Sequence, residues 1–216
     1  IGGLIMKMLK KAAAVLLAAT MSLAMLTACG GGSNVGSAGT NEAYTMEMVL
    51  INENDVAPKE TVTEYITTNG TWSYIEDTYG TDKDVSLQNI KTGEYYIINP
   101  TAMKAYKADE AWDEGEQDHT GMNPTITTTN GTWTDENGKV YTTEIITTAY
   151  SNGKQIETWY CDGDKPAFIK YEFQGKNGNA SEFYRVTQYS RTANESKLNL
   201  KNYTIVENED DLGLNY

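Results

Sequence analysis

Few side chains in this chain could carry out covalent chemistry. It holds two cysteines, Cys29 and Cys161, one histidine, His119, and 30 acidic residues against 17 basic ones in 216 positions. Their pattern indicates no Ser/His/Asp or Cys/His catalytic set and no His/Cys zinc tetrahedron. No glycine-rich phosphate loop follows a strand and opens a helix. We therefore expect a protein that is not an enzyme and that carries no metal and no cofactor.

Carboxylates are the remaining source of catalysis, because two of them are sufficient for a glycosidase. Thirty acids make chance pairs inevitable, so a hydrolase stays a lesser alternative, recognisable by two carboxylates about 5–9.5 Å apart in a cleft. The acidic run Asp109–Asp118 could bind calcium, but it lacks the regular Asp-x-Asp spacing of a calcium loop. A solvated acidic loop is the favoured interpretation of that run.

Cys29 stands at the end of a segment that is typical of a secretion signal. Met6–Lys11 is basic and Ala12–Met25 is an uncharged apolar run, too short to span a membrane and of the right length for a signal peptide. Ile1–Ile5 precede a natural start at Met6 and are interpreted as an upstream extension. The run ends in Leu26-Thr27-Ala28-Cys29, which resembles the lipobox of bacterial lipoproteins: a branched residue, two small ones and the cysteine.

The lipobox resemblance implies that residues 1–28 are removed as a lipoprotein signal peptide. It also implies that the Cys29 thiol is alkylated with diacylglycerol, which would anchor the mature chain to the extracytoplasmic face of the cell membrane. An ordinary secretory signal with a chance cysteine is the alternative. With Cys29 used in this way, no disulfide within the chain can form, and we expect Cys161 to be a buried structural thiol.

Residues 29–42 are expected to be the lipidated cysteine and a tether, because Gly30–Asn41 is rich in Gly and Ser and has no apolar periodicity. The 188 residues after Ala28 hold 14 basic and 30 acidic side chains, a net charge of −16. A body this acidic offers no basic stripe to phosphate, so we expect no nucleic-acid partner. The membrane, through the anchor, is the expected partner, with a hydrophobic ligand or another envelope protein as further candidates.

The body is rich in Thr and Tyr and poor in Leu and Ala, which favours strands over helices. Short alternating runs separated by Asn-Gly and Asp-Gly turns predict about ten antiparallel strands in residues 43–206, followed by an acidic, frayed tail at 207–216. The expected strands are Tyr44–Ile51, Glu60–Thr68, Thr71–Tyr79, Glu94–Asn99, Met103–Lys107, Pro124–Thr134, Val140–Ser151, Lys154–Cys161, Ala167–Gln174, Ser181–Ser190 and Lys197–Val206.

One hexapeptide occurs twice, Thr67–Trp72 and Thr128–Trp133, both reading TTNGTW. The flanking residues match poorly, which argues against a duplicated unit. We interpret the two copies as the same hairpin solution used twice, because Asn-Gly is a strong hairpin signal.

The order of strands and turns resembles the lipoprotein-carrier (LolA-like) superfamily. The stretches that carry the resemblance are Tyr44–Ile51, the Asn69-Gly70 hairpin, Lys91–Pro100 with Lys104-Ala105-Tyr106, Gly138–Glu144, Glu157–Asp164 and Pro166–Tyr171. The resemblance implies a single, strongly curved antiparallel sheet, a half-barrel, often with helices on its concave side. Here the tether runs almost directly into Tyr44, without the amphipathic helix that usually comes first in the family.

Seven aromatic side chains on the expected strands are candidates for lining a ligand groove on the concave face: Trp72, Tyr74, Tyr96, Trp133, Trp159, Tyr171 and Phe173. Core packing alone is the alternative for each of them. The resulting hypothesis is a membrane-anchored, extracytoplasmic, non-catalytic protein that binds a hydrophobic or amphiphilic ligand. The alternative is a surface structural or protein-interaction module with a filled core.

Overall fold

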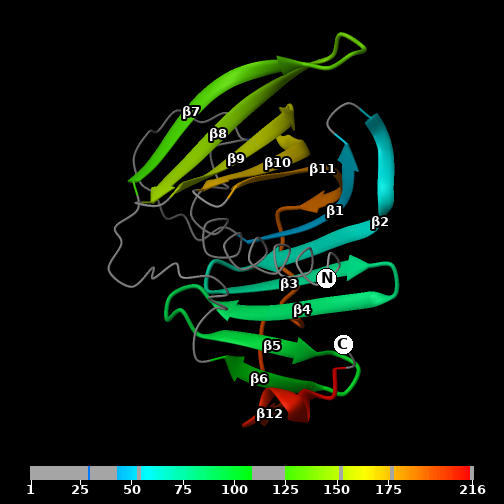
Figure 1. Ribbon diagram of the computed structural model, residues 1–216, viewed down its shortest axis with the longest axis vertical. Helices are drawn as coiled ribbons and strands as arrows, with labels where there is room; N and C mark the ends of the chain where they lie inside the picture. The colour runs from blue at the N-terminus through cyan, green and yellow to red at the C-terminus, as the bar shows by residue number, and fades with distance from the viewer. Residues whose placement is uncertain are drawn as a thin grey trace.

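The computed structural model describes residue 29 and residues 43–52, 55–108, 125–150, 153–175 and 178–214. In this part of the chain the strands form one sheet that is not closed into a barrel, with the order β12-β6-β5-β4-β3-β2-β1-β11-β10-β9-β8-β7 (Figure 1). The predicted signal peptide, the predicted Gly30–Asn41 tether and the acidic run with His119 lie outside the described residues. The mainly β prediction is confirmed.

The twelve strands are β1 (Tyr44–Asn52), β2 (Asp55–Thr68), β3 (Trp72–Tyr79), β4 (Asp82–Asn89), β5 (Tyr95–Asn99), β6 (Lys104–Ala108), β7 (Thr125–Thr134), β8 (Val140–Tyr150), β9 (Gly153–Asp162), β10 (Lys165–Gly175), β11 (Gly178–Ser190) and β12 (Thr204–Val206). Every pair of neighbours is antiparallel except β12 and β6, which run parallel. The sheet is therefore mixed parallel and antiparallel, because β12, near the C-terminus, pairs in parallel with β6 at one end of the sheet.

The strand prediction misses β4 and overextends the last strand. Val85 and Leu87 of β4 are buried on one face of the sheet, while Asp84 and Ser86 alternate with them on the other. The sequence pattern does not reveal this strand, because only two of its eight residues are apolar. At the C-terminal end only Thr204–Val206 pairs as a strand.

The repeated hexapeptide adopts two different structures. In Thr67–Trp72 the chain reverses: Gly70 has φ 75°, and the Asn69 side-chain oxygen accepts hydrogen bonds from the amides of Thr71 and Trp72 at 3.0 and 2.9 Å. In the second copy Asn130 and Gly131 lie inside β7 and pair with Glu144 and Thr143 of β8. The prediction that both copies form hairpins is wrong, because the second copy pairs along its whole length with β8 and is therefore part of a strand.

Strand alternation divides the side chains between two faces of the sheet. We call face 1 the side that bears Met46, Ile66 and Trp159, which belong to one buried apolar cluster with Ile75 and Ile169. The registers of neighbouring strands keep this assignment continuous from β3 through β1 to β9. Face 2 is the opposite side.

Face 2 carries two separate apolar clusters. One contains Tyr74, Leu87 and Tyr96 on β3–β5 and is covered by the segment after β11, through Leu198. The other gathers aromatic rings on the opposite half of the sheet, where Trp133 lies 5.0 Å from the Tyr160 ring, centroid to centroid. Between the two clusters, the middle of face 2 is polar.

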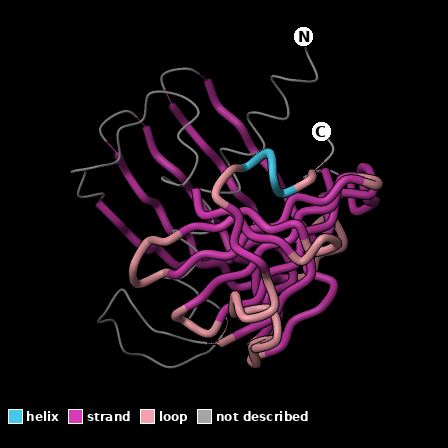
Figure 2. The backbone as a smooth tube through the Cα atoms, turned by 90° about the horizontal axis from the view of Figure 1, so that it is seen from below, coloured by secondary structure: helices cyan, strands magenta, loops and turns pink. Residues whose placement is uncertain are grey.

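The C-terminal residues differ from the frayed tail that was predicted. A short 3-10 helix, η1 (Glu209–Leu212), packs Leu212 completely out of solvent and is drawn near the C-terminal end of the chain in Figure 2. The Asn99 side-chain amide donates to the Leu212 carbonyl oxygen at 3.0 Å. The acidic composition of η1 does not reveal that Leu212 is buried and helps to hold the segment in place.

Candidate functional site

The seven candidate aromatic residues do not line one surface. Trp72, Tyr74 and Tyr96 lie in or against one face 2 cluster and Trp133 against the other, whereas Trp159 and Tyr171 belong to the face 1 cluster. Phe173 pairs with Gln155 two positions along from Tyr171 and therefore also points to face 1. The set is divided between opposite sides of the sheet, so it cannot form a single groove.

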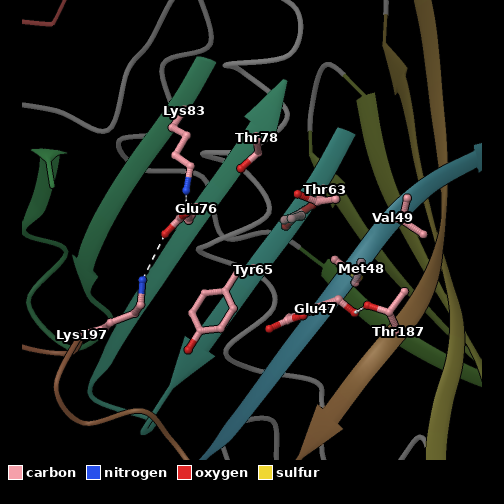
Figure 3. A pocket seen from close by; sticks show the side chains of 11 residues that line it. Glu47, Met48, Val49, Thr63, Tyr65, Glu76, Thr78, Lys83, Thr187 and Lys197 are labelled. Carbon is pink, nitrogen blue, oxygen red and sulfur yellow. Dashed lines mark hydrogen bonds and ion pairs between the residues drawn. The ribbon is translucent and has the colours of Figure 1, made fainter. Parts of the chain in front are cut away.

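The structure instead forms a groove across the middle of face 2, with a cavity volume of about 450 Å³ (Figure 3). Two rows of side chains, each in register across neighbouring strands, make its floor. The first row is Glu47, Tyr65 and Glu76 on β1, β2 and β3, and the second is Val49, Thr63, Thr78 and Lys83 on β1 to β4. Thr187 and Lys197 complete the rim.

One end of the groove is fixed by a network centred on Glu76. Its carboxylate accepts hydrogen bonds from Lys83 Nζ at 2.5 Å, Lys197 Nζ at 3.1 Å and the Tyr74 hydroxyl at 2.9 Å. Burial raises the pKa of Glu76, but the hydrogen bonds from Lys83, Lys197 and Tyr74 outweigh it and bring the pKa to about 2. Glu76 is therefore ionised at neutral pH, and the network carries a net charge of +1.

The Lys197 ammonium also contacts aromatic rings in the groove. It lies 4.3 Å from the centroid of the Tyr74 ring and 4.9 Å from that of Tyr65, within the range of cation–π attraction. At the other end, the Glu47 carboxylate accepts a hydrogen bond from the Gln188 amide at 2.7 Å. The groove thus has a positive end and a negative end, with the Tyr65 ring between them.

On face 1, in contrast, the surroundings raise the pKa of the carboxyl groups. Glu64 and Asp77 stand directly opposite each other on β2 and β3, are 4% and 7% exposed, and accept no hydrogen bond from the described residues. Burial, the neighbouring carboxylates of Asp84 and Glu182, and Glu76 raise the pKa of Asp77 to about 8. Burial and the charge of Asp77 likewise raise the pKa of Glu64.

A second pair of buried carboxylates lies on β8 and β9. Glu157 accepts a hydrogen bond from the Trp159 indole nitrogen. Burial raises its pKa to about 7, against the effect of that hydrogen bond and with a contribution from Glu144.

A glycosidase needs one ionised and one protonated carboxyl group. The pair Glu64 and Asp77 does not show this division, because both pKa values are shifted upwards.

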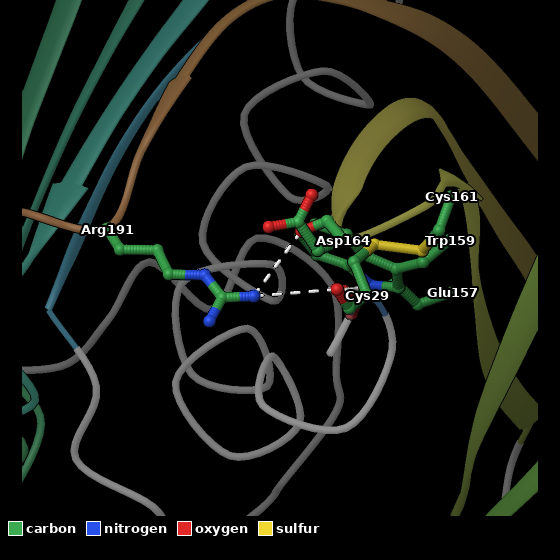
Figure 4. Close-up of a disulfide and its surroundings, with 6 residues drawn as sticks. All are labelled: Cys29, Glu157, Trp159, Cys161, Asp164 and Arg191. Carbon is green, nitrogen blue, oxygen red and sulfur yellow. Dashed lines mark hydrogen bonds between the residues drawn. A yellow bond between two sulfur atoms is a disulfide. The ribbon is translucent and has the colours of Figure 1, made fainter. Parts of the chain in front are cut away.

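Cys29 and Cys161 form a disulfide, with their Cα atoms 5.4 Å apart (Figure 4). Both residues are buried in the face 1 cluster beside Trp159, and the Arg191 guanidinium donates to the Cys29 carbonyl oxygen at 3.5 Å. The prediction that no disulfide forms and that Cys161 is an unpaired thiol is wrong for this form of the chain, whereas its burial is confirmed. A sulfur in a disulfide cannot carry a thioether, so this bond and the predicted lipidation of Cys29 exclude each other.

The described residues contain no group of three or more His, Cys, Asp or Glu side chains that could hold a metal ion. In the same residues no helix is both long and apolar enough to cross a membrane.

The sequence interpretation missed the groove residues because none of them belongs to a motif. Glu47, Tyr65 and Glu76 are distant in sequence and meet only through strand register. The available signal was the alternation on Tyr44–Ile51, which places Glu47 opposite Met46 and Met48. On Thr71–Tyr79 alternation places Glu76 on the same face as Trp72 and Tyr74. Lys197 had no such signal, because it lies outside the strands.

Comparisons with known proteins do not assign the chain to a family. No family model matches it, and no curated protein matches it. A crystal structure described as an uncharacterized conserved protein from Thermus thermophilus is similar over 79% of this chain and 93% of that chain, with 9% sequence identity and a TM-score of 0.45. Likeness at this level establishes neither a shared fold nor a shared function.

Proposed function

We propose that this chain is a lipid-anchored extracytoplasmic protein that binds an amphiphilic ligand, without catalysis, in the groove of face 2. The observation that carries the proposal is the groove itself. Its volume of about 450 Å³ falls in the usual range for small-molecule sites. The half-barrel form implied by the resemblance to lipoprotein carriers belongs to the same proposal.

The composition of the groove favours an amphiphile over a purely hydrophobic ligand. Val49 and the Tyr65 ring offer apolar surface in the floor, while Glu47 and the network of Glu76, Lys83 and Lys197 offer charges of both signs. A headgroup that carries a negative and a positive charge would find a partner for each. The ligand's apolar part would lie across Val49 and Tyr65.

Binding can be tested with lysophosphatidylethanolamine, below its micelle concentration, as the probe in isothermal titration calorimetry. The exposed side chain of Thr63 lines the groove, so Thr63→Trp should fill it and weaken binding about tenfold or more, a loss of about 1.4 kcal/mol. Thr142→Trp, on an exposed position of β8 outside the groove, is the matched control and should bind like the parent chain. The absence of binding, or equal binding by both variants, would overturn the ligand assignment.

Anchoring is supported by the order of the basic segment, the apolar run and Leu26-Thr27-Ala28-Cys29. Two acyl chains would hold the protein stably, since each buried methylene contributes about 0.8 kcal/mol. Cys29→Ala should release the chain from membranes, and Cys161→Ala should leave it there. Intact-mass measurement of the membrane-extracted protein distinguishes a diacylglyceryl thioether on Cys29 from the disulfide with Cys161. Retention of Cys29→Ala on membranes would refute the anchor.

A specific observation also favours the alternative function, a protein-interaction module. Strand β7 at the end of the sheet is exposed over nearly its whole length. This surface is independent of the groove and implies a partner of different chemistry.

A further inference from the structure

In the part of the chain that the structure describes, no strand pairs with the outer edge of β7 along its ten residues. β7 is the last strand in the sheet order, and among the described residues only β8 pairs with it (Figure 1). Nine of its ten residues are exposed and Trp133 is partly buried. An edge strand of this kind presents a row of backbone N–H and C=O groups that can bind another strand.

β7 lacks the features that normally prevent pairing at an edge. Its sequence, TITTTNGTWT, contains no charged residue and no proline. Its register with β8 runs without a shift from Thr125 to Thr134, so no β-bulge turns the edge away. Proteins usually block exposed edges with lysine, proline or bulges, and β7 has none of the three.

The opposite edge of the same sheet is protected. The three residues of β12 pair with β6 there, and the Lys104 ammonium of β6 donates to the Asp211 carbonyl oxygen at 2.7 Å. η1 packs beside this edge through Leu212, which is fully buried. Among the described residues, one edge of the sheet therefore ends in a strand of three residues, while the other ends in a strand of ten.

We propose that β7 pairs antiparallel with β7 of a second copy of this chain, so that the two sheets join across a two-fold axis. The strand is neutral within a chain of net charge −13, so two copies can approach here without the repulsion expected elsewhere. Six of its ten residues are threonines, and opposed threonines stabilise antiparallel pairs. A charge-free threonine strand offers no pocket or charge to select a foreign sequence, whereas two identical strands form an isologous interface.

The test uses sedimentation velocity of the purified full chain up to roughly 100 µM. The expected result is a reversible dimer. Thr127→Lys with Thr129→Lys should weaken dimerisation about tenfold or more, because like charges would face each other across the new pairing. Thr142→Lys, at an exposed position on the neighbouring β8, is the matched control and should leave the dimer unchanged.

Disulfide cross-linking tests whether the contact between the two copies lies at β7. Thr129→Cys should give an interchain disulfide-linked dimer under mild oxidation, and Thr142→Cys should give none. A chain that stays monomeric at the highest concentration would overturn the proposal. A dimer that the paired lysines do not weaken would overturn it too, as would a chain that pairs β7 only with another protein. Because no groove residue lies on β7 or β8, calorimetry with the lipid probe remains a separate result.

Discussion

Glu76 and Asp77 are neighbours in β3, yet they occupy opposite chemical environments. Glu76 points to face 2, where two lysines and a tyrosine hydroxyl bring its pKa to about 2. Asp77 points to face 1, where burial and neighbouring carboxylates raise its pKa to about 8. A single peptide bond separates a carboxylate that stays ionised from a carboxyl group that holds its proton.

This difference separates the tasks of the two faces. Face 2 keeps paired charges at a groove, where ions of both signs can meet a polar ligand at little cost. Face 1 buries carboxyl groups together with Met46, Ile66 and Trp159, where ionisation is unfavourable because burial penalises the charged form. The acidic side chains of this chain therefore do not behave alike: the surroundings on face 2 lower the pKa of Glu76, and those on face 1 raise the pKa of Asp77.

The largest expected effect is a loss of stability as the pH rises. The folded chain keeps protons on Asp77 and Glu157, with pKa values of about 8 and about 7, after the unfolded chain has released them near pH 4. Their stabilising contribution is complete below that pH and is lost as the pH rises through the folded values. The free energy of unfolding in urea should fall by several kcal/mol between about pH 5 and pH 8. A flat profile would contradict the presence of protonated carboxyl groups on face 1.

Asp77→Asn should remove much of that pH dependence. Asparagine keeps the shape of the side chain but cannot ionise, so the variant should be more stable than the parent by about 1–2 kcal/mol at pH 8 and nearly equal to it at pH 5. Asp82→Asn is the control, because Asp82 is exposed on β4 and is not among the carboxylates that raise the pKa of Asp77. Equal effects of Asp77→Asn at both pH values, measured by urea unfolding, would show that ionisation of Asp77 is not the cause.

Glu76→Gln should act in the opposite direction. It leaves Lys197 and Lys83 without their carboxylate partner, and we expect a loss of about 1 kcal/mol at pH 7. The parent's own contribution from Glu76 is present above the ordinary pKa of 4.5 and is lost as the pH falls toward 2. Glu94→Gln, which breaks the more exposed pair with Lys107, should cost less stability than Glu76→Gln, because solvent screens an exposed pair. If the two variants lose equal stability, the Glu76 network has no special role.

The smallest effect on stability is expected from Lys83→Met. The Lys83 side chain is 52% exposed, so unfolding in urea should change by less than about 0.5 kcal/mol. Binding of lysophosphatidylethanolamine should nevertheless weaken, because the positive end of the groove is lost. Lys107→Met, with a similarly exposed ammonium outside the groove, should change neither quantity. Unchanged binding by Lys83→Met would remove Lys83 from the site.

Local patterns in the sequence predict most strands but not their context. Alternation predicts the bounds of β1, β3 and β10 closely, because each has one buried and one more polar face. The two TTNGTW copies are locally identical, and only the pairing of the second with β8 makes it a strand. β4 has two apolar residues in eight, too few to be recognised without its neighbours.

The site was less accessible to prediction than the fold. Aromatic type alone does not identify the groove, because the groove depends on which residues lie opposite each other across β1, β2 and β3. The lipobox interpretation assigns the Cys29 sulfur to a lipid and therefore does not predict the Cys29–Cys161 disulfide. A residue's type indicates what it can do, and only register and burial show which residues act together.

The proposed ligand site on face 2 is tested most directly by mapping amide chemical shifts in NMR spectra during titration with lysophosphatidylethanolamine. The largest shifts are expected on the two floor rows, at Glu47, Tyr65, Thr63 and Thr78, with little change at Met46, Ile169 and Trp159. Shifts that concentrate on the face 1 residues, or no saturable shifts at all, would contradict a ligand site in this groove.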